Sequence, residues 1–310
     1  MTKKKVGIIA LIIIIISAVV MVFAYGIKNK QVVVSEDDKM KIVVTSFPQY
    51  DFARAITGDK ANVKMLLSPG TESHDYDPTP AAVLEISEAD IFIYTGDSME
   101  TWAAEMLKNI NTEKVRVLDC TQGIEFRRSD DEHDHEIDPH VWTSPVNAGI
   151  MVKNILDAVC AVDPENTEYY RSNADNYLKQ LEELDAEFRT IVAEGKRKEI
   201  VFGSRFALKY FAEEYGLSYT AAIASCESED EPSVSVMNSI IEKVKTEKIP
   251  VVYYEELTEP RIAQKIAEAT GCEIRQFHSC HNLSKDEFDR GVSYIDLMKE
   301  NAKVLKEGLS

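Results

Sequence analysis

The six histidines of the chain fall into three separate places, and acidic residues surround most of them. They are His74, then His133, His135 and His140, then His278 and His281. Each place lies at the end of an expected strand or in the loop beyond it. A neutral imidazole nitrogen is the commonest protein ligand for Zn²⁺, which it binds at about 2.0–2.1 Å. The distribution therefore predicts a chain that folds around a transition metal.

Short runs of Val, Ile and Leu alternate with helical segments from residue 41 onward. Strands are expected at 41–45, 63–67, 91–95 and 115–118, with helices at 49–57, 81–87 and 100–110. Later strands are expected at 199–202, 218–223, 250–254 and 273–277, with helices at 206–215, 234–246, 261–270 and 291–309. This alternation predicts an α/β fold with two doubly wound lobes, each a parallel sheet covered by helices on both faces.

A long amphipathic segment lies between the two expected lobes. Its apolar residues recur every three or four positions: Tyr170, Ala174, Tyr177, Leu181, Leu184, Phe188 and Ile191. This spacing predicts one rigid helix over 163–194, about 45 Å long, with Asp163 as N-cap and Gly195 at its end. The stripe also suits a coiled-coil dimer, but we favour packing across the protein's own lobes, expected at 38–157 and 196–310.

The first 30 residues predict a signal segment or membrane anchor. A run of twenty mostly apolar residues, Val6 to Tyr25, follows three lysines. Its length suits a bilayer span, and the positive-inside rule leaves the remainder outside the cytoplasm. The run either stays as an anchor or is cut near Ala24-Tyr25-Gly26, a small-x-small pattern. We favour the anchor, with the body on the outer face of the cytoplasmic membrane.

Charge excludes one class of partner. The chain has a formal net charge of −18, and from residue 31 on it holds 30 basic against 53 acidic residues, a net −23. Such a surface repels nucleic acid and anionic lipid, and it enriches cations nearby.

Among the five cysteines, Cys226, Cys272 and Cys280 allow one disulfide of unknown pairing.

Three of the histidines are expected on one rim of the fold. In open α/β sheets, ligands bind beyond the carboxyl ends of the strands. His74 follows the strand at 63–67, His140 follows the fourth strand, and His281 follows the strand at 273–277. If they share one ion, their rings must lie within about 8 Å of one another.

The chain resembles the zinc/manganese solute-binding proteins of ABC importers (cluster A-I) over about residues 41–309. The motifs that carry the resemblance are Thr45-Ser-Phe-Pro48, Gly70 to His74, Tyr76-Asp-Pro-Thr-Pro80, Asp138-Pro-His-Val-Trp142, Tyr210-Phe-Ala212, Glu231-Pro-Ser233, and Ser293-Tyr294 with Asn301. The resemblance implies four metal ligands in the cleft between the lobes, two from each lobe. It assigns the first two to His74 and His140.

The chain departs from the family at the third ligand. The family usually has histidine or glutamate where this chain has Arg205, and a guanidinium has no lone pair for a metal. Glu255, at a strand end, or Glu229, in an acidic run, would pair with Arg205 or replace the missing ligand. We favour Glu255 as the carboxylate ligand.

The fourth family ligand aligns best with His281. His278 is an alternative, and Cys280 between them would suit zinc as a thiolate. Three imidazoles and a carboxylate favour Zn²⁺ over Mn²⁺, which prefers more oxygen ligands. His133 and His135 stand in an acidic segment that either gathers metal weakly or is a plain solvated loop.

These observations predict the extracytoplasmic component of a metal importer, which captures Zn²⁺ and delivers it to an ABC permease in the same membrane. We expect a monomer and no enzyme, since no H-E-x-x-H, Gly-x-Ser-x-Gly or phosphate-binding glycine loop is found. The alternatives are a manganese- or iron-binding homologue, a zinc-dependent hydrolase, or a surface adhesin on the same scaffold.

Overall fold

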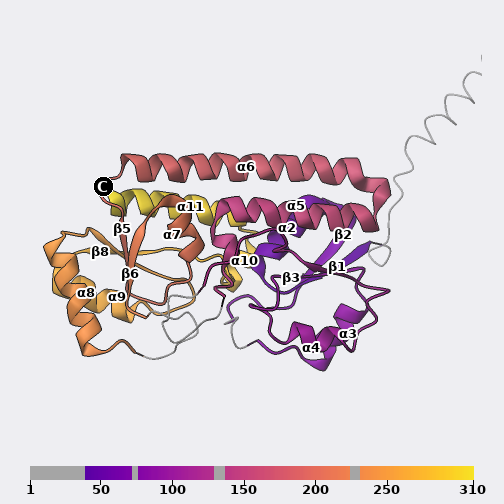
Figure 1. Ribbon diagram of the computed structural model, residues 1–310, viewed down its shortest axis with the longest axis horizontal. Helices are drawn as coiled ribbons and strands as arrows, with labels where there is room; N and C mark the ends of the chain where they lie inside the picture. The colour runs from indigo at the N-terminus through magenta and orange to yellow at the C-terminus, as the bar shows by residue number, and fades with distance from the viewer. Residues whose placement is uncertain (1–38, 72–75, 129–136, 224–230) are drawn as a thin grey trace, which may run out of the picture. The chain divides into compact units, whose positions relative to one another are not determined.

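Two four-stranded parallel sheets form the framework of the body, Met40–Ser310, in the computed structural model (Figure 1). The structure describes residues 39–71, 76–128, 137–223 and 231–310. The first sheet has the order β2-β1-β3-β4 and the second has the corresponding order β6-β5-β7-β8. We call the first sheet with helices α2–α5 the first lobe, and the second sheet with α7–α11 the second lobe. The predicted α/β class with two parallel-sheet lobes is confirmed.

The strands are short and mostly buried, as expected for sheets covered on both faces. Their bounds are β1 Met40–Val44, β2 Ala61–Met65, β3 Ile91–Tyr94, β4 Arg116–Asp119, β5 Glu199–Phe202, β6 Ser218–Ala221, β7 Val251–Tyr254 and β8 Glu273–Gln276. The helices are α2 Phe47–Thr57, α3 Pro80–Ser87, α4 Ala103–Leu107, α5 Pro145–Val162, α6 Thr167–Glu194, α7 Lys209–Tyr215, α8 Val234–Thr246, α9 Arg261–Thr270, α10 Lys285–Asp289 and α11 Tyr294–Leu309. Single 3₁₀ turns are η2 Gly58–Lys60, η3 Val141–Thr143 and η4 Pro164–Asn166.

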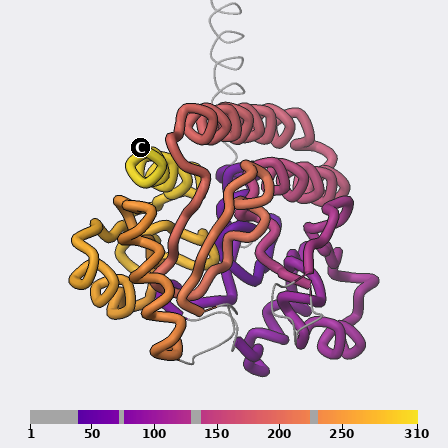
Figure 2. The backbone as a smooth tube through the Cα atoms, turned by 60° about the vertical axis from the view of Figure 1, so that its left-hand side comes forward, coloured from indigo at the N-terminus to yellow at the C-terminus, as the bar shows by residue number. Residues whose placement is uncertain are grey.

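Helix α6 runs across both lobes (Figures 1 and 2). All seven residues of the predicted apolar stripe are buried. They are covered by α2 and α5 of the first lobe and by α7 and α11 of the second. The packing within the protein's own lobes is therefore confirmed. The expected N-cap is wrong: Asp163 instead starts the turn η4 and accepts a hydrogen bond from the Tyr170 hydroxyl at 2.6 Å.

Helix α5 lies beside α6 and has no counterpart among the elements expected from the sequence. By length and composition it is the one helix of the described residues that could cross a membrane. Its buried residues include Met151, Val152 and Ile155, which belong to the core of the body. The run at 6–25 lies outside the described residues.

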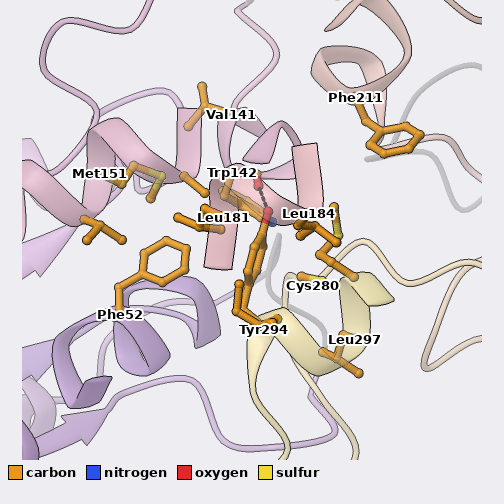
Figure 3. Close-up of a cluster of buried hydrophobic side chains, with 14 of the residues drawn as sticks. Phe52, Val141, Trp142, Met151, Leu181, Leu184, Phe211, Cys280, Tyr294 and Leu297 are labelled. Carbon is orange, nitrogen blue, oxygen red and sulfur yellow. Dashed lines mark hydrogen bonds between the residues drawn. The ribbon is translucent and has the colours of Figure 1, made fainter. Parts of the chain in front are cut away.

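One hydrophobic core joins the two lobes. It extends from Ile42 and Ile93 of the first sheet to Phe202 and Tyr253 of the second, with the α6 stripe between them. Figure 3 shows its centre, where Trp142 and Tyr294 meet Leu181 and Leu184. Each sheet also has a smaller cluster on its other face. The lobes therefore share a core rather than touching only at their surfaces.

The differences from the expected elements have local causes. The helix expected at 100–110 starts at Ala103, because the Glu100 carboxylate turns inward to accept the Thr95 N–H at 2.9 Å. The helix expected at 206–215 starts only at Lys209.

The disulfide allowed by the sequence is not formed between Cys272 and Cys280, which are free thiols, and Cys226 lies outside the described residues.

Candidate metal centre

His140 stands at the start of η3, shortly before α5, and its side chain is fully buried. Asp138 holds the ring through one carboxylate oxygen. This oxygen, Oδ1, accepts from the His140 backbone N–H and from ring atom Nδ1, both at 2.9 Å. A hydrogen on Nδ1 directs the lone pair of the neutral ring to Nε2, which is also buried. Carboxylate partners of this kind orient metal-binding histidines and increase their basicity.

The charge of Asp138 is maintained by its surroundings. Burial opposes ionisation, but His140 outweighs it, through its charge when the ring is protonated and through hydrogen bonds from the ring and the backbone; with the charge of Lys209, these interactions lower the pKa of Asp138. Tyr210 of α7 secures the same turn from the second lobe, since its hydroxyl donates to the Asp138 carbonyl at 2.8 Å. The Asp138 turn is thus fixed by both lobes.

His281 lies beyond β8 and meets His140 although 141 positions separate them in sequence. The two ring centroids lie 5.5 Å apart, and the rings are nearly perpendicular. Two imidazoles bound to one tetrahedral zinc through nitrogens at known bond lengths have centroids about 5 Å apart. The spacing thus fits a shared ion and falls within the limit set from the sequence. The indole of Trp142 packs against His281, with the two ring centroids 4.9 Å apart, and gives the histidine an apolar neighbour.

The two other candidates near His281 have different surroundings. The Nδ1 atom of His278 accepts the Cys280 backbone N–H at 2.9 Å. The ring hydrogen is then on Nε2, which leaves neither nitrogen with a lone pair for a metal. Burial raises the pKa of the Cys280 thiol well above its ordinary value, and nearby acids add to this. The thiol lies with Tyr294 and Leu297 in the core (Figure 3), so the thiolate that would bind a metal is disfavoured.

Glu255 and Arg205 follow the neighbouring strands β7 and β5. Glu255 is buried, and its Oε1 accepts the backbone N–H of Ala207 at 2.9 Å. Arg205 is half-buried, and its carbonyl accepts the Ser204 hydroxyl at 2.8 Å. Among the described residues, no three His, Cys, Asp or Glu side chains form a group that could hold a metal. Glu255 is therefore not brought into such a group with the histidine pair.

The remaining expected residues, His74, His133, His135 and Glu229, lie outside the described residues. Sequence reasoning missed several partners that hold the histidines. Asp138 had a signal, because an aspartate two residues before a histidine can reach its Nδ1. Glu256 had none: it is buried and accepts from the backbone N–H and hydroxyl of Ser279 at 2.8 and 2.6 Å, next to the histidine segment.

Comparison with known proteins agrees with this architecture. The model of the family "zinc-uptake complex component A, periplasmic" matches residues 42–308. The chain is 34% identical over 286 residues to the high-affinity zinc uptake system protein ZnuA of Bacillus subtilis, an alignment that covers 89% of each chain.

Solved structures have the same fold. The metal-dependent lipoprotein YcdH of Bacillus subtilis superposes with a TM-score of 0.78 at 34% identity, over 87% of this chain and 99% of that one. The Zn(II)-bound ZnuA-like domain of Streptococcus pneumoniae AdcA superposes with a TM-score of 0.77 at 32% identity, over the same shares. The match to the full-length AdcA lipoprotein spans only 56% of its length.

Proposed function

The chain belongs to the family of periplasmic zinc-uptake components, and from this premise we propose that it is the solute-binding component of a zinc importer. The body works on the outer face of the cytoplasmic membrane. It binds Zn²⁺ as cargo and delivers it to an ABC transporter permease. We propose that it acts as a monomer with no catalytic activity of its own, and that its first lobe ends with α5, its linking helix is α6, and its second lobe begins near residue 196.

The contact between His140 and His281 is the observation that carries this proposal. Their ring spacing suits one shared ion, and Asp138 maintains one ring in the tautomer that a metal needs. We propose that His74 supplies the third imidazole, as its motif suggests. A tetrahedral zinc would take its fourth ligand from the acidic segment around Glu229 or from water.

We assign Arg205 and Glu255 to the surroundings of the ion. A guanidinium cannot bind a metal, and its charge opposes a nearby dication. The Glu255 carboxylate accepts the backbone N–H of Ala207. This bond holds the segment between Arg205 and α7 in place. This arrangement favours a zinc site with fewer protein ligands from the second lobe.

The test is zinc affinity of the purified body, measured by competition with a chromogenic chelator. We expect His140→Ala and His281→Ala each to abolish tight binding, since each removes one of the imidazoles. Asp163→Asn is the control: Asp163 accepts side-chain hydrogen bonds in the turn before α6, outside the histidine segment, and the affinity of this variant should stay close to the wild-type value. Wild-type affinity in either of the first two variants would refute the assignment. Binding should also weaken as the pH drops through about 6, because protons compete for the imidazoles.

A further inference from the structure

The segment 278–283, which carries His281, follows a strand of the second lobe but forms hydrogen bonds to both lobes. The Trp142 indole donates to the Ser279 carbonyl at 2.9 Å. The Phe47 backbone N–H donates to the His281 carbonyl at 3.4 Å, and the Gly70 N–H donates to the Leu283 carbonyl at 2.7 Å. All three donors belong to the first lobe.

Asn282 makes the most specific of these connections. Its side-chain Nδ2 donates to the carbonyls of Ser68 and Thr71, both at 2.9 Å, and its Oδ1 accepts the Leu283 N–H at 2.9 Å. Asn282 is only 2% exposed, so these bonds have little competition from water. Because both partners on the first lobe are carbonyls, only the NH₂ group of the amide can face them.

The second lobe holds the other end of the segment. Asn301 of α11 accepts the His278 N–H at 2.7 Å and donates to the His278 carbonyl at 2.8 Å. Glu256, which follows β7, accepts from the backbone N–H and the hydroxyl of Ser279. Next along the chain is Cys280, whose φ of +61° is unusual for a residue other than glycine. Beyond this point, the described hydrogen bonds of the segment to other parts of the chain lead to the first lobe.

We infer that Asn282 is a positioning residue for zinc binding, which fixes His281 to the lobe that carries His140. The inference rests on the proposed function. The amide does not touch the metal; it joins the backbone next to His281 to the loop at 68–71. These first-lobe contacts of residues 281–283 help to set the 5.5 Å spacing of the two rings. Residues that hold metal ligands in this way typically contribute 10–100-fold to affinity.

The experiment compares Asn282→Ala with Asn301→Ala in the full chain. Both residues are 2% exposed. The Asn282 amide joins the segment to the first lobe through two hydrogen bonds to backbone, and the Asn301 amide holds it with two hydrogen bonds to backbone from the second lobe. We expect Asn282→Ala to weaken zinc affinity by about 10–100-fold. Asn282→Ala and Asn301→Ala should lower the melting temperature of the metal-free protein by similar amounts. The loss of zinc affinity should be smaller for Asn301→Ala. If Asn282→Ala does not fold, Asn282→Asp removes the two donors at constant size.

A double-mutant cycle separates positioning from general destabilisation. If Asn282 acts through His281, Asn282→Ala should cause no further loss of affinity in the His281→Ala background. An equal loss in both backgrounds, or wild-type affinity in the single Asn282→Ala variant, would overturn the inference alone. Wild-type affinity in His281→Ala would overturn the ligand assignment and the inference together.

Discussion

At the scale of single residues, the Asp138–His140 pair is the best-defined part of the candidate site. One carboxylate oxygen orients both the backbone and the ring of the histidine. The motif Asp-Pro-His indicates this pair in the sequence, because the two side chains are close along the chain. Contacts made by Asn282 and Glu256 could not be predicted, since they join residues far apart in sequence and neither type is diagnostic of such a role.

Replacing the carboxylate by an amide tests the role of this pair. Asp138→Asn retains the shape but removes the charge that stabilises the ring orientation, so zinc affinity should fall by about 10–100-fold. Asp163→Asn is the control, because Asp163 also accepts side-chain hydrogen bonds but belongs to the turn before α6. A chelator competition assay measures both variants. Equal affinities for Asp138→Asn and the wild type would exclude the orienting role.

Arg205 is the position where this chain departs most clearly from the family pattern. Arg205→His replaces a fixed positive charge by a neutral imidazole, so zinc should bind at least several-fold more tightly if the position faces the ion. Arg197→His is a matched control, because Arg197 is held by the Lys248 carbonyl at the opposite end of the second sheet. Isothermal titration with zinc distinguishes the two. Unchanged affinity for Arg205→His would mean that the position does not face the metal.

At the scale of secondary-structure elements, the strands were predictable because their apolar runs are short and bounded by turn residues. Helix α5 was not, since apolar residues lie on much of its surface and its polar positions are few. Helix ends moved where a buried polar side chain competes with the helix, as Glu100 does before α4. The carboxylate of Glu100 joins the ends of β1 and β3, with bonds from the Thr45 hydroxyl at 2.5 Å and the Thr95 N–H at 2.9 Å.

The buried Glu100 should make stability depend on pH. Burial raises its pKa to about 7; hydrogen bonds from Thr45 and Thr95 oppose the shift, and the charge of Asp119 adds to it. A raised folded-state pKa stabilises the protein at low pH, and this contribution is lost as the pH rises from about 4.5 to about 7. Urea unfolding of the metal-free body should therefore show a loss on the order of 1–3 kcal/mol across this window.

Substitution identifies the group responsible for that loss. Glu100→Gln, which cannot ionise, should reduce the pH dependence of the unfolding free energy. The exposed Glu105 serves as the control, and Glu105→Gln should leave the profile as in the wild type. An unchanged profile in Glu100→Gln would assign the effect to other groups.

The end of β5 depends on a close approach to α9 at Gly203. A Cβ atom at this position would lie 2.6 Å from the Cα atom and 2.7 Å from the nitrogen of Ala263, which are backbone atoms. Gly203→Ala should therefore lower the free energy of unfolding by about 1–3 kcal/mol. Gly149→Ala is the control: in α5 the added atom meets only the Leu178 Cδ2 atom at 3.7 Å, and the helix should gain up to about 1 kcal/mol. Similar melting temperatures for both variants would contradict this account.

At the scale of the whole body, zinc should couple the site to global stability. A ligand that binds only the folded state at 100 times its Kd stabilises it by about 2.7 kcal/mol. We therefore expect saturating zinc to raise the melting temperature by several degrees and a chelator to reverse the rise. His140→Ala should show no such shift, whereas Asp163→Asn should retain it. A shift of full size in His140→Ala would locate the bound zinc elsewhere.

The shared core around α6 has a consequence for how such chains can be recombined. The main hydrophobic core includes residues of both sheets and the apolar stripe of α6, and helices of both lobes pack on that stripe. Neither lobe therefore completes its core without α6. Exchange of one half between two relatives would thus bring mismatched surfaces together along the full length of α6. We expect viable chimeras to transfer the body as a single block, so that the unit of inheritance is larger than the lobe.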